Sequence, residues 1–223
     1  MDKPMLLDTD SESRLSERIH QLLLERILSG QMKPGDIVAE KKLALELGVS
    51  RTPVHDALRD LIKDGFLHQQ KNKRPQVTGF SAQDVFDIFD IRILLEGEAC
   101  FRAATRIDRL TLSYLRERAE YLQHRQKDQA WLEQWAEFDD EFHRSIAAAS
   151  GSKRLMQDII KHRLSHRALN IQAESPDAFT HSLMEHLDIL DALDLRDAPL
   201  AKITMQTHIS ESQTFFVSKF STN

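Results

Sequence analysis

Apolar residues recur at helical spacing along most of the chain, and the Gly and Pro residues that interrupt such patterns fall mainly before residue 80. Over 15–29 the apolar positions share one helical face, and Gly30 follows them as an expected C-terminal cap. A shorter helix is expected over 41–47, because Gly48 comes directly after its last apolar residue. The pattern therefore predicts two helices in the front part of the chain.

A third helix is expected after Ser50, with Pro53 in its first turn, where a missing N–H costs little. One face of this helix is apolar, whereas Arg51, His55 and Arg59 share another face at intervals of four residues. Because only Gly-Val-Ser separates this helix from the preceding one, the pair has the helix-turn-helix pattern.

Two short strands are expected after the third helix. Residues 66–70 and 76–78 flank Lys71-Asn72-Lys73-Arg74-Pro75, so we expect a hairpin with a basic tip. A helix-turn-helix followed by a hairpin is a winged helix-turn-helix domain, which we predict over 15–79. Residues 1–14 are expected to form a flexible N-terminus.

Beyond residue 80 nearly every segment fits a helix. Ser81 is the expected cap of a first long helix, because an acidic residue follows in its first turn. Further helices are expected at about 109–126, 129–150, 153–172, 180–193 and 198–219. The predicted fold class is therefore mainly α, with an all-α antiparallel bundle over 80–221 behind the winged domain.

The composition fits a globular protein of this kind. The 223 residues include 41% hydrophobic and 29% charged side chains, enough for one large or two modest domains. The net charge of −5 argues against nonspecific nucleic-acid binding by the whole surface, but the part before residue 80 is close to neutral. We find neither a signal peptide nor a membrane segment, so we expect a cytoplasmic location. The lone Cys100 is expected to be a small core residue.

Three histidines and one carboxylate stand on inward-looking faces of the predicted bundle helices. Asp139 and His143 are four residues apart, so they share a face, and His186 and His208 lie among apolar residues of later helices. Carboxylate and imidazole groups bind divalent metals. Taken singly, however, each His is more often a hydrogen-bonded core residue, and the sequence does not give distances between helices.

Arg92 lies in the middle of an apolar helix, where an unpaired charge is costly. One interpretation is a structural ion pair with Glu96, one helical turn further on.

Residues 27–67, ILSGQMKPGDIVAEKKLALELGVSRTPVHDALRDLIKDGFL, resemble the N-terminal winged helix of GntR-type bacterial transcription regulators. The resemblance covers about 15–79 and implies a homodimer that binds a short palindrome of double-stranded DNA, with the third helix in the major groove and the wing near the minor groove. An Arg fork matches the guanine edge, which suits this arrangement. The residues expected to contact DNA are Glu40, Lys41, Ser50, Arg51, Thr52, Pro53, His55, Arg59, Lys71, Lys73 and Arg74.

The chain departs from the GntR pattern at two points. His55 stands where the family usually has Arg, and the wing carries Lys71-Asn72-Lys73-Arg74 where glycines are usual. Loss of one Arg fork is expected to change one base preference, while the basic wing adds phosphate or minor-groove contacts.

The back part, over about 82–215, resembles the FCD effector domain of the FadR-type GntR subgroup through Asp-x-x-Phe-His at 139–143, Glu-His at 185–186 and His208. The resemblance implies that Asp139, His143, His186 and His208 hold a divalent metal ion, with zinc as the first expectation and nickel or manganese as alternatives. It also implies that Arg92 faces the cavity and binds a small carboxylic-acid effector.

Together these features predict a ligand-responsive transcription regulator, expected to be a repressor and not an enzyme. Two alternatives stay open: a metal-dependent helical enzyme acting on a small organic acid, and a regulator whose metal is purely structural. The predicted bundle over 80–221 has neither the Glu-x-x-His pairs of di-iron bundles nor a nucleophile motif, which disfavours the enzyme. Spacing assigns no role to the remaining histidines, and Arg163 and His166 are at most candidates to line the pocket.

Overall fold

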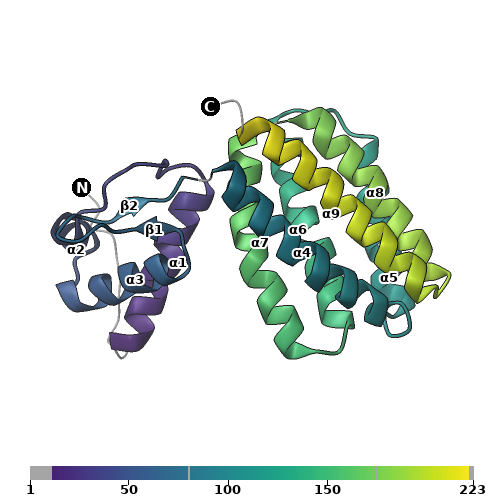
Figure 1. Cartoon of the computed structure of the whole chain (residues 1–223), viewed down its shortest axis with the longest axis horizontal. Coiled ribbons are helices and arrows are strands. Elements are labelled where there is room, and N and C mark those ends of the chain that lie inside the picture. Colours follow the sequence, from purple (N-terminus) through teal and green to yellow (C-terminus); the bar gives the residue numbers. More distant parts are fainter. Residues whose placement is uncertain (1–11, 80, 174, 221–223) are drawn as a thin grey trace. The chain divides into compact units, whose positions relative to one another are not determined.

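The computed structural model describes residues 12–79, 81–173 and 175–220. These residues form nine helices and two short strands (Figure 1). The helices are α1 Glu12–Leu28, α2 Glu40–Leu47, α3 Arg51–Lys63, α4 Ala82–Ala103, α5 Arg109–Gln123, α6 Gln129–Ala149, α7 Lys153–Ala173, α8 Pro176–Asp194 and α9 Ala198–Phe220. The strands are β1 Leu67–His68 and β2 Gln76–Val77. The chain divides into two compact units, one ending at Gly79 and one containing α4 to α9.

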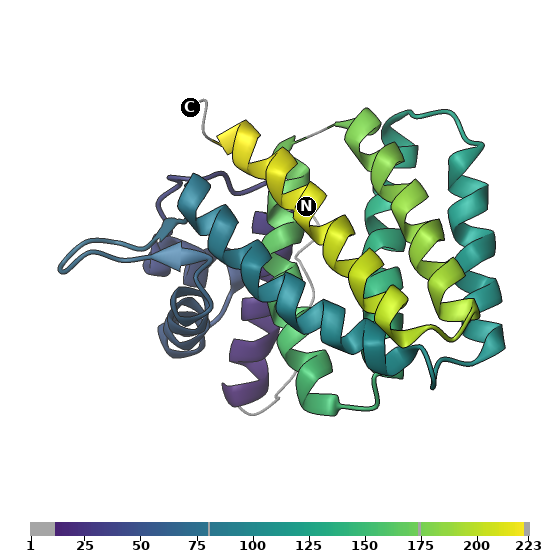
Figure 2. The ribbon, with the colours of Figure 1, turned by 45° about the vertical axis from the view of Figure 1, so that its right-hand side comes forward.

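The N-terminal unit is a winged helix-turn-helix, as the pattern predicts. Helix α3 packs on α1 and α2, and its buried side chains are Pro53, Val54, Ala57, Leu58 and Leu61. Gly48 ends α2 in the left-handed conformation, with φ of 68°, and its N–H bonds to carbonyls of the last turn. Strand β1 pairs antiparallel with β2, and the loop between them extends away from the helices of this unit (Figure 2).

Several element boundaries differ from the expected ones. Helix α1 begins at Glu12, so residues 12–14 are helical rather than part of a flexible terminus, and residues 1–11 lie outside the described part. Each strand has only two residues, because the turn uses backbone groups that a longer ladder would need: Lys73 N–H bonds to the Gln70 carbonyl, 3.0 Å away. Helix α8 begins at Pro176 rather than near 180, since Pro is well suited to the first helical position.

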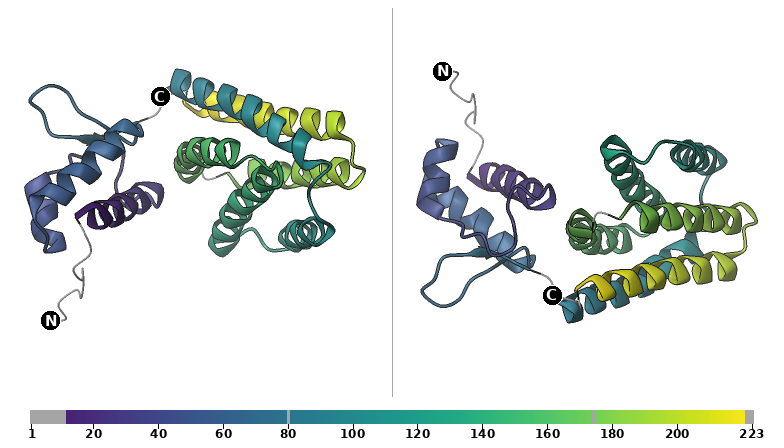
Figure 3. Two further views of the ribbon diagram at one scale, coloured as in Figure 1. Left: turned by 90° about the horizontal axis from the view of Figure 1, so that it is seen from below. Right: turned by 90° about the horizontal axis from the view of Figure 1, so that it is seen from above.

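The C-terminal unit is a bundle of the six helices α4 to α9. Helices α4 and α9 run side by side, and α8 packs against α9 (Figure 3). Gly97 permits the close approach of α4 to α9, because a Cβ atom there would lie 2.6 Å from Cγ of Gln206. The expected cap at Ser81 is confirmed: its side chain accepts a hydrogen bond from Asp84 N–H, and the Asp84 carboxylate accepts one from Ser81 N–H.

The bundle core is mostly apolar and aromatic, and Cys100 is fully buried in it as expected. The same unit also buries a group of polar and charged side chains, which in an ordinary core would be costly. Its members include Arg92, Glu96, Asp139, His143, Arg163, His166, His186 and His208. Among the described helices we find none long and apolar enough to cross a membrane.

Candidate metal centre and nucleic-acid interface

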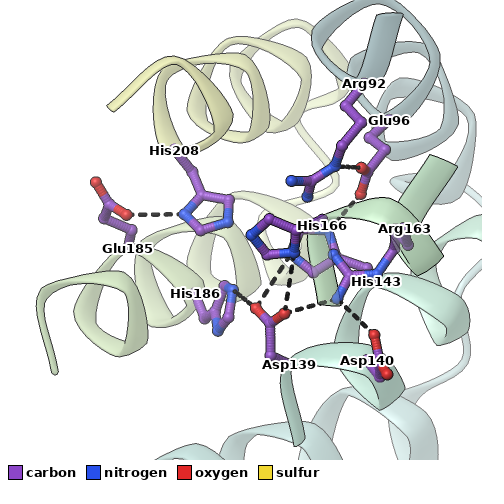
Figure 4. Close-up of polar contacts among 10 residues, drawn as sticks. All are labelled: Arg92, Glu96, Asp139, Asp140, His143, Arg163, His166, Glu185, His186 and His208. Carbon is purple, nitrogen blue, oxygen red and sulfur yellow. Dashed lines mark hydrogen bonds and ion pairs between the residues drawn. The ribbon is translucent and has the colours of Figure 1, made fainter. Parts of the chain in front are cut away.

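Four side chains from three helices meet inside the bundle (Figure 4). Asp139 and His143 extend from α6, His186 from α8 and His208 from α9, and none is more than 3% exposed. One ligand atom from each of the four lies within 4.8 Å of the others. The structure therefore brings together the complete set of residues that the sequence singled out as metal ligands.

The separations suit one small ion. Oδ1 of Asp139 lies 3.5 Å from Nε2 of His186 and 3.7 Å from Nε2 of His143. Zinc bonds to nitrogen and oxygen are about 2.0–2.2 Å long, so two ligand atoms on one ion are at most about 4.4 Å apart. The four groups are thus close to the spacing that a shared divalent ion requires.

The hydrogen-bond pattern also fits a metal. Nε2 of His143 and both ring nitrogens of His186 are buried without a hydrogen-bond partner among the described residues. Buried polar atoms in native proteins are normally paired, and an ion would supply the missing partner. Burial lowers the pKa of His143 and His186 well below the usual value, and nearby positive charges such as Arg163 contribute. Burial also lowers the pKa of His208, to about 4, because its effect outweighs the opposing charge of Asp139. The rings are therefore neutral at pH 7, the form that binds a metal.

Two carboxylates orient the histidines. Oε2 of Glu96 lies 2.5 Å from Nδ1 of His143, and Oε2 of Glu185 lies 2.7 Å from Nδ1 of His208. A carboxylate on one ring nitrogen fixes the ring and leaves the other nitrogen for a metal. The sequence pattern does not assign this role to either carboxylate. The adjacency of Glu185 to His186 in the Glu-His motif was the one available signal.

Helix α7 adds two further side chains that sequence spacing did not single out. Nη2 of Arg163 donates to Oδ2 of Asp139 at 2.6 Å and to Oδ1 of Asp140 at 3.0 Å. Nδ1 of His166 lies 3.8 Å from Oδ2 of Asp139. Arg163 thus holds one oxygen of Asp139 and leaves Oδ1 on the side of the histidines.

The predicted pair of Arg92 with Glu96 is present. Nε of Arg92 donates to Oε1 of Glu96 at 2.7 Å, and both side chains are buried. Nη1 of Arg92 has no hydrogen-bond partner among the described residues, and the guanidinium points toward the cluster in Figure 4. The ion pair therefore leaves one donor of Arg92 available beside the candidate ligands.

A cavity of about 270 Å³ reaches two of the four candidate ligands, Asp139 and His208, but Arg92, which was expected to face it, is not among its described lining residues. Its described lining residues are Trp135, Asp139, His166, Ala178, Phe179, His181, Ser182, Glu185, His208, Glu211, Ser212, Phe215 and Phe216. A larger hollow of about 910 Å³ lies on the N-terminal unit between α1 and α3, but it contains none of the predicted site residues. The smaller cavity is therefore the one that can receive a ligand at the metal centre.

The row of charged residues on α3 is exposed. Arg51, Thr52, His55 and Arg59 all lie on the face opposite the core, and the Ser50 hydroxyl makes no cap hydrogen bond. Backbone N–H groups and hydroxyls at a helix start are suited to bind phosphate. Pro53, also expected to contact DNA, is buried in the core-facing side of the helix, which corrects that expectation.

Glu40 organises this face from the start of α2. Its Oε1 accepts from Nε of Arg51 at 2.9 Å, and its Oε2 lies 3.1 Å from Nδ1 of His55. Glu40 thus holds two of the side chains that we expect to contact DNA. Lys41 beside it is exposed and remains a predicted DNA contact. The same holds for the wing residues Lys71, Lys73 and Arg74.

The wing replaces the usual glycines without losing the turn. Asn72 has φ of 61°, in the left-handed region that Asn tolerates better than most residues. The turn is closed by Gln69, whose side chain donates to the Lys73 carbonyl at 2.7 Å. The departure from glycine is therefore compatible with a tight, basic tip.

Two family models match the chain. The model for bacterial regulatory proteins of the gntR family matches residues 15–77, and the FCD domain model matches residues 87–211. These ranges coincide with the two units seen in the structure.

Individual relatives and solved structures are also similar to this chain. The uncharacterized HTH-type transcriptional regulator YdhC of Bacillus subtilis (strain 168) is 35% identical over 103 residues, and the match spans only 46% of its length. The HTH-type transcriptional repressor RspR of Escherichia coli (strain K12) is 26% identical over 201 residues, 88% of this chain and 86% of RspR. The solved structure of E. coli McbR/YncC has a TM-score of 0.76 at 22% identity, over 92% of this chain and 98% of that one, which shows a shared fold.

Proposed function

Because the chain belongs to the GntR family of bacterial regulatory proteins and carries an FCD domain, we propose that this DNA-binding transcription regulator responds to a small carboxylate bound at a metal ion in its helical unit. The observation that carries the proposal is the cluster of four buried ligand atoms within 4.8 Å, two of whose histidines have unpartnered ring nitrogens. The relatives described above are named transcription regulators, which disfavours an enzymatic function.

The ion would be held by Asp139, His143, His186 and His208. Zinc is the first expectation, and nickel and manganese are the alternatives. A bound divalent ion supplies a Lewis acid that attracts a carboxylate oxygen. The unpartnered Nη1 of Arg92 adds a charge-assisted hydrogen-bond donor beside it. These two groups together favour a small organic acid over a neutral ligand.

Operator binding would use the exposed face of α3 and the basic wing, in the cytoplasm where the bacterial chromosome lies. Binding to a short palindrome requires a homodimer. An exposed apolar strip on the helical unit supports one: Ile91, Leu94 and Phe101 share a face of α4, and Ile203 is exposed on the neighbouring α9. Repression is the proposed outcome, since a relative matched over most of its length is named a repressor.

The ligand would act by favouring one arrangement of the bundle helices that set the separation of the two DNA-binding units of a dimer. Helices α6, α8 and α9 all contribute candidate ligands, so a metal with its carboxylate ties three helices together. In the alternative, the ion is saturated by protein ligands and serves only the stability of the bundle.

Metal content and operator affinity test the proposal together. An operator is first selected from random duplex DNA with the purified protein, and its affinity is then measured by fluorescence anisotropy with acetate, succinate or citrate. We expect metal to be lost in His143→Ala and His208→Ala but kept in His124→Ala, an exposed control. Unchanged metal content in both cage variants would refute the metal site. If the protein holds metal but none of the acids changes its operator affinity, the metal serves only the stability of the bundle.

A further inference from the structure

The cavity beside the metal centre is larger than a carboxylate group needs. It measures about 270 Å³, and Asp139 and His208 are among its described lining residues. Since a protein cavity of roughly 150 Å³ is already large enough for benzene, a ligand whose carboxylate reaches the metal has room for a ring in the rest of the cavity.

Aromatic and small apolar side chains form much of the remaining wall. Trp135 and Phe179 are stacked, with ring centroids 4.0 Å apart and an angle of 8° between the planes. Phe215 and Phe216 from α9 add two more rings, 5.1 Å apart, and Ala178 lies in the same lining. Aromatic walls favour a flat apolar body, which gains both buried area and ring contacts.

Three titratable side chains in the lining are already partners of one another. Nε2 of His181 lies 2.9 Å from Oε2 of Glu211 and 3.4 Å from Oε1 of Glu185. Glu185 also shares a hydrogen bond with Glu211, and its Oε2 lies 2.7 Å from Nδ1 of His208. Because these groups satisfy one another, they require no polar group on the body of a ligand.

The charges of the same three side chains disfavour a second anionic group on the ligand. The described lining contains no Lys or Arg, and His181 lies between the carboxylates of Glu185 and Glu211. A second ligand carboxylate would lose its hydration in the cavity, and it would face two acidic side chains without a cation to pair with among the described lining residues.

We propose that the effector is an aromatic monocarboxylate. Its carboxylate lies at the metal, its ring lies among Trp135, Phe179 and Phe216, and it carries no second charge. This inference rests on the proposed function, because it takes the metal-bound carboxylate as one end of the ligand. It goes further by excluding the dicarboxylic and tricarboxylic acids.

Isothermal titration calorimetry of the metal-loaded full-length protein tests the ligand class. The probes are acetate, phenylacetate, 4-nitrophenylacetate and 4-carboxyphenylacetate, with acetate measured by displacement of phenylacetate. A nitro group has the shape of a carboxylate without its net charge, so the last two probes isolate the effect of charge. We expect phenylacetate to bind at least about tenfold more tightly than acetate, and 4-carboxyphenylacetate to bind at least about tenfold more weakly than 4-nitrophenylacetate.

Filling the cavity tests the place of the ring. Ala178→Leu adds apolar volume to the lining, so phenylacetate should lose about tenfold in affinity while acetate changes less than about twofold. Ala198→Leu is the matched control, because Ala198 is also partly buried against the bundle core but is not among the described lining residues. Retained acetate binding shows that the variants are folded and hold their metal. Equal loss of phenylacetate in both variants, or in neither, would place the ring elsewhere.

Removing one acidic charge tests the exclusion of a second carboxylate. Glu211→Gln keeps the shape of the side chain, so the ratio of affinities for 4-nitrophenylacetate and 4-carboxyphenylacetate should fall by about threefold at low salt, whereas phenylacetate should change little. Glu120→Gln, an exposed change on α5, is the matched control. An unchanged ratio in Glu211→Gln would contradict the electrostatic exclusion.

The two levels of proposal fail differently. If no probe binds the metal-loaded protein, the carboxylate site of the proposed function is refuted. If acetate binds as tightly as phenylacetate, or 4-carboxyphenylacetate as tightly as 4-nitrophenylacetate, the aromatic monocarboxylate is the wrong class while the carboxylate site stands.

Discussion

Oε2 of Glu185 lies 2.7 Å from Nδ1 of His208, so a residue that is not itself one of the four candidate ligands fixes the orientation of one that is. The contact leaves Nε2 of His208 as the nitrogen available to an ion. Because Glu185 also lines the cavity, it connects the metal centre to the space proposed for the ligand.

Glu185→Gln should weaken metal binding. Without the carboxylate, the His208 ring is a poorer and less well oriented ligand. Such a loss lowers metal affinity by roughly 10- to 100-fold. Competition with a chelating indicator measures the change. Asp188→Asn removes an exposed carboxylate from the same helix and should leave the affinity as it is. Equal affinities in both variants would show that Glu185 does not support the metal.

Gly97→Ala should have opposite effects in two backgrounds. In the natural protein the added Cβ would meet Cγ of Gln206 at 2.6 Å, and the resulting strain should exceed the gain in helix propensity, so the change should destabilise the bundle. In a Gln206→Ala background the clash is gone, so the same change should stabilise the bundle by about 1 kcal/mol. Thermal unfolding of the four proteins of this cycle measures both values. Additive effects would mean that the two side chains do not compete for space.

Replacing Asn72 tests the turn of the wing. Asn72 has φ of 61°, a conformation that a β-branched residue adopts only at a cost and that Gly adopts freely. Asn72→Val should therefore destabilise the hairpin by about 1–2 kcal/mol, whereas Asn72→Gly should be tolerated. Lys71→Val changes a neighbouring position that has no positive φ and is the control. Thermal unfolding of the N-terminal unit, followed by circular dichroism, is the measurement. A similar stability for all three variants would contradict the strained turn.

His55 should set a base preference. Its Nδ1 lies 3.1 Å from Oε2 of Glu40, so Nε2 is the ring nitrogen that we expect to contact a base, whereas an Arg at this position offers a longer fork with more donors. We expect His55→Arg to shift the selected operator at one base pair in each half-site toward the family's usual base. Selection of binding sites from random DNA with both proteins decides this. Identical selected sequences would show that His55 does not set a base preference.

Lys73 in the wing should contribute affinity without sequence preference. If it contacts one phosphate, Lys73→Gln weakens binding to all sequences alike and reduces the slope of log affinity against log salt by about 0.9. Lys127→Gln, an exposed change in the other unit, serves as the control. A loss confined to the best operator would instead indicate a base contact.

The sequence was most informative where chemistry follows local spacing. Intervals of four residues placed Arg51, His55 and Arg59 on one exposed face, and the structure has them there. Local patterns were less informative at element ends, where turn hydrogen bonds shorten the strands and Pro176 moves the start of α8. The contact of Glu96 with His143, and the contacts of Arg163 and His166 with Asp139, could not be predicted, because they join different helices.

By itself the sequence determined the elements and the candidate ligands, because hydrophobic periodicity and residue type are local properties that a helix converts directly into faces. Only the tertiary structure decided that Asp139, His143, His186 and His208 converge, and that they do so beside a cavity with aromatic walls. The packing of one helix against another depends on the shapes of whole faces, such as the close approach that Gly97 allows. Burial then decides the chemistry, since it keeps the histidines neutral and leaves donors and acceptors in need of a partner.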